Sequence, residues 1–326
     1  MSATVRVGVC SWADETLTKV WYPPGVRSAE ERLRYYTDRF GVVEANSTYY
    51  RLPDSALVGT WAERTPPGFT MHVKAFGLMT RHPVKLEALP EDLRDAMPVD
   101  ERGRVDRPPR ELRAEVFRRF AAALEPLRMT GKLGGILLQF PSYVVHKPAS
   151  LEYIEWAQEQ LPGEELLLEF RHRSWLDEEH RAETLAFLES RGLTYVIVDA
   201  PKTDAKNLVQ TVVARTSSTG YVRYHGRNAA TWNKRTGSAA ERFDHLYSTD
   251  ELEEWVEPLR ELASDADEVY AMFNNNGRST MPSFGGVAGL DPYEVAGDPK
   301  KGLLAQAPAN ALMLRQILAD AGVDVA

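Results

Sequence analysis

Eight short apolar runs are spread along the whole chain, and most of them end in a polar or ionisable side chain. The runs are Val5–Cys10, Val42–Asn46, Phe69–Lys74, Ile136–Gln139, Leu166–Arg171, Tyr195–Asp199, Tyr221–His225 and Val269–Asn274. Apolar runs of this length are typical of parallel strands that are buried on both faces. They constrain the fold more than any other feature, because they require a sheet whose strands are covered on both sides.

Helical patterns lie between these runs. Ser28 and Glu31 have the spacing of a capping box, Asp54 can cap a short helix, and Gly192 is placed to end another. Further helices are expected over 116–127, from Ser150, after Thr249 and around Pro308, whereas the segment between Asp199 and Tyr221 has no clear pattern. Strands that alternate with helices indicate βαβ units. Eight such units predict an α/β fold of the (β/α)8 TIM-type barrel class, and no Gly-x-Gly-x-x-Gly motif supports a dinucleotide-binding sheet instead.

Length and composition agree with one barrel domain over residues 1–326. The formal net charge of −8 disfavours non-specific binding to nucleic acid or to anionic membranes. No apolar stretch is long enough to cross a bilayer, the first residues have no signal-peptide pattern, and the single cysteine, Cys10, suits a reducing compartment. We therefore expect a cytoplasmic protein without a membrane partner, and the sequence gives no signal for an oligomeric state.

Three connections are unusually long: 76–113, 226–247 and 277–307. Each follows a predicted strand, so each is expected on the C-terminal face of the barrel, where such enzymes carry their active sites. Long connections in compact domains are commonly lids or irregular segments.

Strand alternation places several polar side chains on one face. Residues two apart share a face, as do Glu44 with Asn46, His72 with Lys74, Glu169 with Arg171, and Arg223 with His225. The opposite faces are apolar and suit the layer under the helices. The sequence therefore predicts an inward ring of Glu44, Lys74, Gln139, Glu169, Arg171, Asp199, Arg223 and His225. Buried charges need partners, so the ring is either a network of ion pairs alone or such a network that also contacts a ligand.

Acid–base catalysis is the chemistry this ring suits best. We expect Glu44 and Glu169 to act as the proton donor and acceptor, with His225 as a proton shuttle. The predicted substrate-binding residues are Lys74, Arg171 and Arg223 for an anionic group, Gln139, Asn46 and Asn274 for the polar shell, and Trp12 and Trp232 to close over it. The expected ligand is a small anionic or sugar-like metabolite, the reaction that of a hydrolase or isomerase, and no cofactor is required.

Two other functions use the same region. Glu44, Glu169, Asp199 and His225 form a possible ligand set for a divalent metal in a phosphodiester- or nucleic-acid-processing barrel, although the interleaved cations would compete for the carboxylates. Rim residues suited to nucleic acid are Trp12, Tyr49, Tyr50, Trp175 and Trp232 with Arg51, Arg173, Arg227 and Arg235. The remaining function is non-catalytic binding of an anionic small molecule.

Several other reactive side chains receive less weight. Cys10 is expected to be a buried, inert thiol. His172 and Arg173 either reach a substrate or cap the next helix. His82, His146, His180 and His245 show no partner set in the sequence and are expected at the surface or in loops.

A set of motifs extends over essentially the whole sequence: Gly8–Trp12, Val43–Pro53, Gln139–Pro141, Glu169–Trp175, Val222–Arg227 and Phe273–Asn275. In these motifs the chain resembles the YecE-like family, a barrel group of unknown function. The resemblance implies a (β/α)8-type barrel and supplies no reaction. The segment from Gly277 to Gln306 departs from the family pattern and looks like an insertion.

Overall fold

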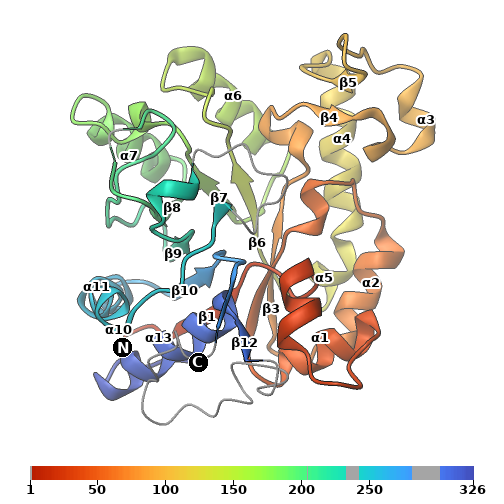
Figure 1. The fold of residues 1–326 in the computed structure, drawn as a ribbon. Helices are drawn as coiled ribbons and strands as arrows, with labels where there is room; N and C mark the ends of the chain where they lie inside the picture. The colour runs from red at the N-terminus through yellow and green to blue at the C-terminus, as the bar shows by residue number, and fades with distance from the viewer. Residues whose placement is uncertain (1, 204, 233–241, 281–301) are drawn as a thin grey trace. The chain divides into compact units, whose positions relative to one another are not determined.

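The fold is a closed barrel of eight parallel strands, in the order β1-β10-β9-β8-β7-β6-β3-β2, in a computed structural model (Figure 1). The structure describes residues 2–203, 205–232, 242–280 and 302–326. The strands are β1 (Val5–Val9), β2 (Val42–Ala45), β3 (Thr70–Lys74), β6 (Leu133–Gln139), β7 (Leu166–Glu169), β8 (Thr194–Asp199), β9 (Thr219–Tyr224) and β10 (Glu268–Phe273). Each apolar run of the sequence forms one of these strands, which confirms the predicted barrel.

Within this fold the chain divides into two compact units. Unit 1 comprises residues 1–44, 188–204 and 210–326, and unit 2 comprises residues 45–187 and 205–209.

Unit 1 contains a run of parallel pairings in which β1 pairs with β10, β10 with β9, and β9 with β8. Helix α13 (Gln306–Asp320) packs against β1 and β10. Helix α1 (Ala29–Thr37) begins with the predicted capping box between Ser28 and Glu31. The last residue returns to the first strand, since the Ala326 backbone N–H donates to the Val5 carbonyl over 2.9 Å.

Unit 2 contains the parallel strands β3, β6 and β7. Helix α2 (Ser55–Arg64) begins at Asp54, whose carboxylate accepts a 2.8 Å hydrogen bond from the Leu57 N–H, as predicted. It packs against α4 (Arg110–Ala123) and α5 (Glu125–Met129), which lie beside it in Figure 1. Helix α6 (Pro148–Glu159) follows β6.

Two helix boundaries differ from the prediction. Helix α6 begins at Pro148, not at Ser150, which is buried; proline suits the first turn because it has no N–H to leave unpaired there. The helix expected after Thr249 is divided into α10 (Thr249–Glu253) and α11 (Val256–Ser264). Helix α7 (Arg181–Ser190) ends just before Gly192, which has φ +63°. This confirms the prediction that the glycine ends the helix.

The long connections contain structure of their own. Residues 76–113 include the antiparallel pair β4 (Val84–Lys85) and β5 (Arg104–Val105), with α3 (Glu91–Arg94) between them. The connection 226–247 contains α8 (Ala229–Trp232), and residues 233–241, including the candidate Arg235, lie outside the described residues. In 277–307, β11 (Arg278–Thr280) pairs with β12 (Leu303–Ala305), and 281–301 lie outside the described residues.

No helix in the described ranges is both long and apolar enough to cross a membrane.

Candidate functional site

In unit 1 a fully buried ion pair joins β2 to β9. Arg223 Nη2 donates to Glu44 Oε1 over 2.6 Å, and neither side chain is exposed to solvent. In the barrel order, β10 and β1 separate β9 from β2, so the contact crosses the interior. This confirms that Glu44 and Arg223 point inward, as strand alternation predicted. Together with Tyr221, His225 and Asn274, they form what we call the Glu44 cluster.

Tyr221 is the second hydrogen-bond partner of Glu44. Its hydroxyl donates to Glu44 Oε2 over 3.0 Å, so both carboxylate oxygens accept a hydrogen bond. The sequence contained the signal for this residue, because Tyr221 lies two positions before Arg223 and therefore shares its face. Burial, followed by the charge of Glu44, raises the pKa of the nearby Cys10 thiol well above its ordinary value. A protonated, buried thiol is a poor nucleophile, which agrees with the inert role expected for Cys10.

His225 lies between Arg223 and Asn274. Arg223 Nη1 is 3.3 Å from His225 Nε2, and the Asn274 amide is 2.9 Å from His225 Nδ1. The guanidinium of Arg223 and the amide nitrogen of Asn274 both donate, so a neutral imidazole, which has one accepting nitrogen, can accept from only one of them at a time. The rings of Trp232 and Phe243 pack on the same imidazole, with centroids 6.2 Å and 5.3 Å away.

A second polar cluster lies in unit 2, at the ends of β3, β6 and β7. Lys74 Nζ donates to Gln139 Oε1 over 2.8 Å, and Gln139 Nε2 donates to Glu169 Oε1 over 2.6 Å. Arg171 Nη1 donates to the same Glu169 oxygen over 2.9 Å. Glu169 is fully buried, whereas the Arg171 side chain is 15% exposed and Lys74 is half-buried. We call these four residues the Glu169 cluster.

Tyr49 links the Glu169 cluster to other aromatic rings and to a cavity whose lining residues do not include the four residues of the cluster. Lys74 Nζ lies 4.6 Å from the centroid of the Tyr49 ring, which also packs edge-on against His82. Burial, reinforced by the charges of Lys74 and Arg171, lowers the pKa of His82 to about 3. Tyr49 also lines a cavity of about 450 Å³ with Tyr50, Arg51, Pro83, Val84, Lys85, Glu87 and Ala88. No pattern in the sequence pointed to Tyr49 as a neighbour of Lys74.

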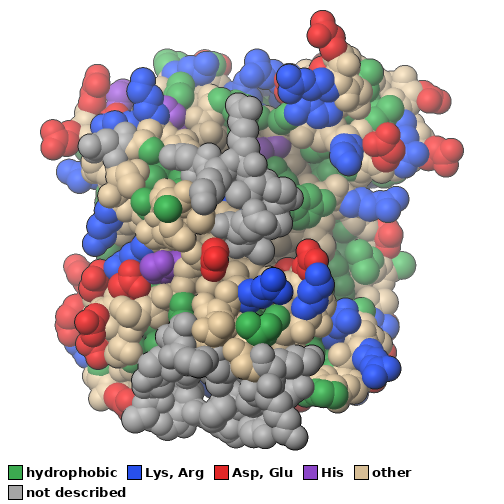
Figure 2. All heavy atoms as spheres, viewed as in Figure 1, with side chains coloured by type: hydrophobic (Ala, Val, Ile, Leu, Met, Phe, Trp, Pro, Cys, Tyr) green, Lys and Arg blue, Asp and Glu red, His purple; other side chains and the backbone are tan. Residues whose placement is uncertain are grey.

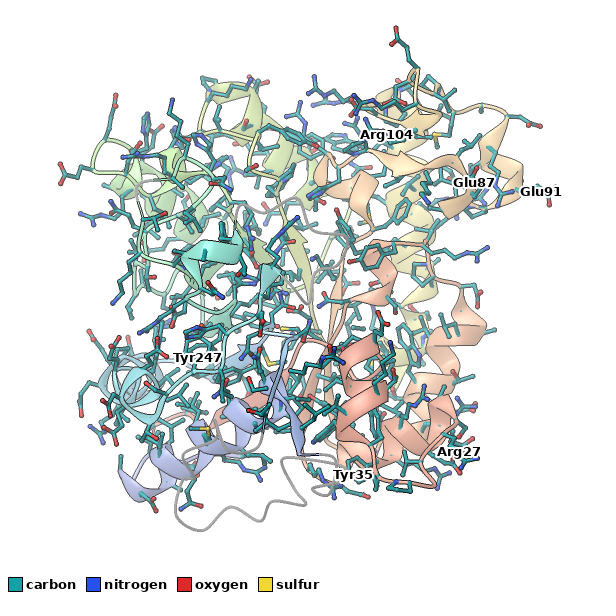
Figure 3. All side chains as sticks on the ribbon, viewed as in Figure 1. Arg27, Tyr35, Glu87, Glu91, Arg104 and Tyr247 are labelled. Carbon is teal, nitrogen blue, oxygen red and sulfur yellow. The ribbon has the colours of Figure 1, made fainter. Side chains whose placement is uncertain are left out.

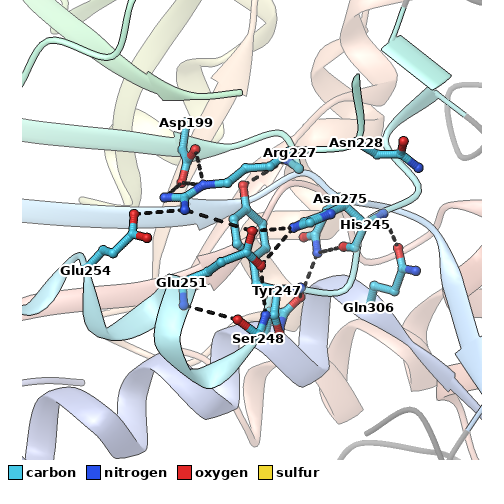
Figure 4. Close-up of polar contacts among 12 residues, drawn as sticks. Asp199, Arg227, Asn228, His245, Tyr247, Ser248, Glu251, Glu254, Asn275 and Gln306 are labelled. Carbon is cyan, nitrogen blue, oxygen red and sulfur yellow. Dashed lines mark hydrogen bonds and ion pairs between the residues drawn. The ribbon is translucent and has the colours of Figure 1, made fainter. Parts of the chain in front are cut away.

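Asp199 makes different contacts from those expected of a metal ligand. Its carboxylate accepts hydrogen bonds from Arg227 Nε and Nη2, both over 2.9 Å (Figure 4). It also accepts one from Trp255 Nε1 over 2.8 Å. Arg227 Nη1 also donates to Glu254 over 2.9 Å. Asp199 therefore holds the connection after β9 and the helix pair α10–α11 together. Among the described residues, no three His, Cys, Asp or Glu side chains are arranged to bind a metal ion.

Some candidate residues on the rim are less accessible than the sequence suggested. Trp175 is fully buried, stacks on Phe170 with centroids 4.0 Å apart, and donates to the Val144 carbonyl; it is therefore not placed to stack on a base. Trp12 and Trp232 are also buried, at 6% and 5% exposure. Asn46 is half-buried and precedes the short helix of residues 47–49.

The remaining histidines have partners that the sequence did not reveal. His245 contacts Glu251 over 3.0 Å and His180 contacts Asp177 over 2.9 Å, while His146 packs on His180 with ring centroids 4.4 Å apart. These histidines lie in loops and turns, as expected, and the acidic partners of His180 and His245 are three and six residues away in the chain. His172 caps the short helix after β7 by accepting a hydrogen bond from the Ser174 N–H, which is one of its two expected roles.

A closed parallel barrel with polar side chains at its strand ends defines this chain as a TIM-type α/β protein. The family model described as "Protein of unknown function DUF72" matches residues 6–283, and the chain belongs to this family. The expected YecE-like relationship is thereby confirmed, because YecE-like proteins are members of the same family.

Individual relatives agree with this assignment. The chain is 28% identical over 275 residues to the UPF0759 protein YunF of Bacillus subtilis, which covers 83% of this chain and 89% of YunF. A crystal structure of a DUF72 family protein from Thermotoga maritima is 29% identical, with a TM-score of 0.70 over 97% of this chain and 99% of that one. A DUF72 family protein from Enterococcus faecalis is 21% identical, with a TM-score of 0.72 over 97% and 96% of the two chains, and shows the same fold.

Proposed function

We propose that the chain is a cytoplasmic acid–base enzyme that acts on a small anionic or polyhydroxylated metabolite at the Glu169 cluster. The observation that carries the proposal is the fixed position of a fully buried carboxylate between an amide and a guanidinium. Buried titratable groups clustered with opposite charges are common at catalytic sites. In a TIM-type barrel the ends of the strands are where such groups act.

Each residue of the cluster has a chemical role in this proposal. Glu169 is the general acid–base residue, which transfers a proton to or from the substrate. Lys74 and Arg171 bind the anionic group of the substrate and stabilise negative charge that develops in the transition state. Gln139 bridges Lys74 and Glu169 and fixes the direction of the carboxylate. The cavity beside Tyr49 has a volume typical of small-molecule sites and supports a ligand of metabolite size.

The Glu44 cluster has a different role in the proposal. Both oxygens of Glu44 accept hydrogen bonds, from Tyr221 and Arg223, which favours a positioning role for Glu44 over proton transfer. His225 and Asn274 belong to the same chain of contacts. The assignment of Glu169 as the catalytic residue does not require any of these five residues.

The test begins with a panel of phosphorylated, carboxylated and sugar-like metabolites, screened by thermal shift and then by turnover. We expect Lys74→Met and Arg171→Met to weaken binding of the active compound by about tenfold or more, because each removes a charge-assisted hydrogen bond. Glu169→Gln should still bind it, with kcat lowered by about 10²–10⁴-fold. Lys147→Met, at an exposed lysine before α6, is the control and should change neither.

Two outcomes would overturn the proposal. Normal turnover by Glu169→Gln would exclude Glu169 as the acid–base residue. Tight binding without turnover of any compound by the wild-type chain would make the protein a non-catalytic binder of the same ligand.

A further inference from the structure

A group of arginines surrounds Tyr153 in unit 2, on elements that do not contribute to the Glu169 cluster. Arg81 and Arg113 both place their guanidinium groups over the Tyr153 ring, with Cζ 5.0 Å and 5.3 Å from its centroid. Arg81 follows the short helix of residues 77–80, and Arg113 lies in the first turn of α4. Arg107 lies just before α4 and contributes to lowering the pKa of Arg81, after burial, as does Arg113. The Arg113 side chain reaches back to the carbonyl of Pro108, the residue that follows Arg107, which brings these two arginines near each other.

Arg113 is the least expected of the three. It is only 7% exposed, its Nε has no hydrogen-bond partner, and it forms no ion pair with any described residue. Its Nη2 donates to the Pro108 carbonyl over 3.2 Å. Lone buried charges are costly, and proteins normally pair them with a counter-charge. The pairing that Arg113 lacks within the described chain is therefore expected to come from a ligand.

The backbone holds the other two arginines in an uncommon conformation. Arg81 has φ +67° and Arg107 has φ +49°, and these are the positive φ values found at non-glycine residues of the described ranges. Side chains with a Cβ atom rarely adopt this region, and such residues persist where function requires them. The Tyr143 hydroxyl donates to the Arg81 carbonyl over 2.6 Å and helps to fix that turn.

Among the described residues, Arg81 and Arg113 form no ion pair, and the ion pair of Arg107 is a weak one. Asp106 is 3.8 Å from Arg107 Nε, a long contact between two largely exposed side chains. By contrast, Arg104 in the adjacent β5, which is labelled in Figure 3, forms an ion pair with Asp100 over 2.9 Å. Figure 2 shows Lys and Arg side chains gathered beside the β4–β5 hairpin at the top of the view.

We propose that Arg81, Arg107 and Arg113 bind a phosphate-type oxyanion next to the N-terminus of α4. Guanidinium groups match the oxygens of phosphate in bidentate geometry, and a helix N-terminus adds favourable partial charge. The oxyanion is either free inorganic phosphate or the terminal phosphate group of a small metabolite. This site is independent of the function proposed for the Glu169 cluster.

The test uses the full chain and inorganic phosphate, titrated at constant ionic strength with sodium chloride as the balancing salt. Phosphate should raise Tm and give a calorimetric binding isotherm, while chloride should do neither. Arg81→Gly should weaken phosphate binding by about tenfold or more, since it removes a hydrogen bond between charged groups. Glycine adopts positive φ without strain, so this variant keeps the turn, and its Tm without phosphate should not fall.

Three further variants and ligands make the result specific. Arg118→Gln, at an arginine paired with Glu115 on the exposed face of the same helix, should bind phosphate normally. Lys147→Met, at the exposed lysine before α6, should also bind phosphate normally. Phenyl phosphate that binds as well as phosphate would identify the terminal group of a metabolite, and preference for phosphate alone would identify the free ion. Equal phosphate effects in wild type and Arg81→Gly, or none in wild type, would overturn the proposal.

Discussion

Glu44 and Arg223 form an ion pair across the barrel interior, with 2.6 Å between Oε1 and Nη2 and no exposure of either side chain. Removal of one partner leaves the other as an isolated buried charge. We therefore expect Glu44→Gln and Arg223→Met each to lower the free energy of unfolding by about 3–5 kcal/mol. The double variant should lose less than the sum, because it removes both charges together. Urea unfolding followed by circular dichroism measures all three.

The exposed pair Glu30 and Arg34 on α1 provides the control. Its side chains are 42% and 67% exposed, and such pairs on a helix contribute about 0.3–0.5 kcal/mol. Additive losses for Glu44→Gln and Arg223→Met would show that the buried pair is not an energetic unit.

Gly134 in β6 makes room for a histidine on the adjacent strand. A Cβ atom at this position would lie 2.4 Å from Thr70 Cγ2 and 2.7 Å from His72 Cε1. Gly134→Ala should therefore lower the free energy of unfolding by about 1–3 kcal/mol through overpacking. Gly59→Ala in α2 meets no atom within 4 Å and should instead raise it by about 0.5–1 kcal/mol. Equal effects of the two substitutions would contradict the tight packing at β6.

Acid should destabilise the fold partly through His72. Burial lowers the pKa of this imidazole from 6.5 to about 3. As the pH falls through that window the unfolded chain binds a proton that the folded chain does not, so the free energy of unfolding falls by up to about 1.4 kcal/mol per pH unit. His72→Met should lose less stability than wild type between neutral pH and pH 4, measured by urea unfolding at each pH.

His180 should change the pH dependence of stability in the opposite direction to His72. Its hydrogen bond with Asp177 raises its pKa, so its contribution to stability is present at low pH and is lost as the pH rises through the folded pKa. His180→Asn should therefore make the loss of stability in acid steeper. A slope that is the same in wild type and both variants would mean that neither histidine is coupled to folding.

The barrel could be predicted from sequence because each of its strands is a short apolar run, and most of these runs end in a polar residue. Both features can be read locally, without knowledge of the tertiary structure. Strand alternation also placed Glu44 and Arg223 on the inner face, since a period of two is independent of tertiary structure. The helix starts were less predictable. Helix α6 begins at Pro148 and not at the predicted Ser150. Both residues suit the first turn of a helix, so the sequence alone does not decide between them.

The partners of the polar residues could not be predicted in the same way. Asp199 ends β8 like the other strand-end residues, yet it binds Arg227 from the next connection and Trp255 at the start of α11. The lack of an acidic partner for Arg113 among the described residues could not be predicted either, because it depends on how α4 packs against Tyr153. Such contacts join residues far apart in the chain, and no local pattern encodes them.

The pairing of β11 with β12 has a practical consequence for the segment between them. Arg278 lies opposite Ala305 and Thr280 opposite Leu303, and the Gln306 N–H donates to the Gly277 carbonyl over 3.1 Å. Thr280 and Leu303, which flank residues 281–301, are thus held one strand spacing apart before the chain enters α13. Since the entropy of closing a loop rises only slowly with its length, segments of other lengths can be spliced in at this point. Because the β11–β12 pair fixes the residues on both sides, a peptide or an affinity tag can be inserted between them without a change in the register of β1 and β10.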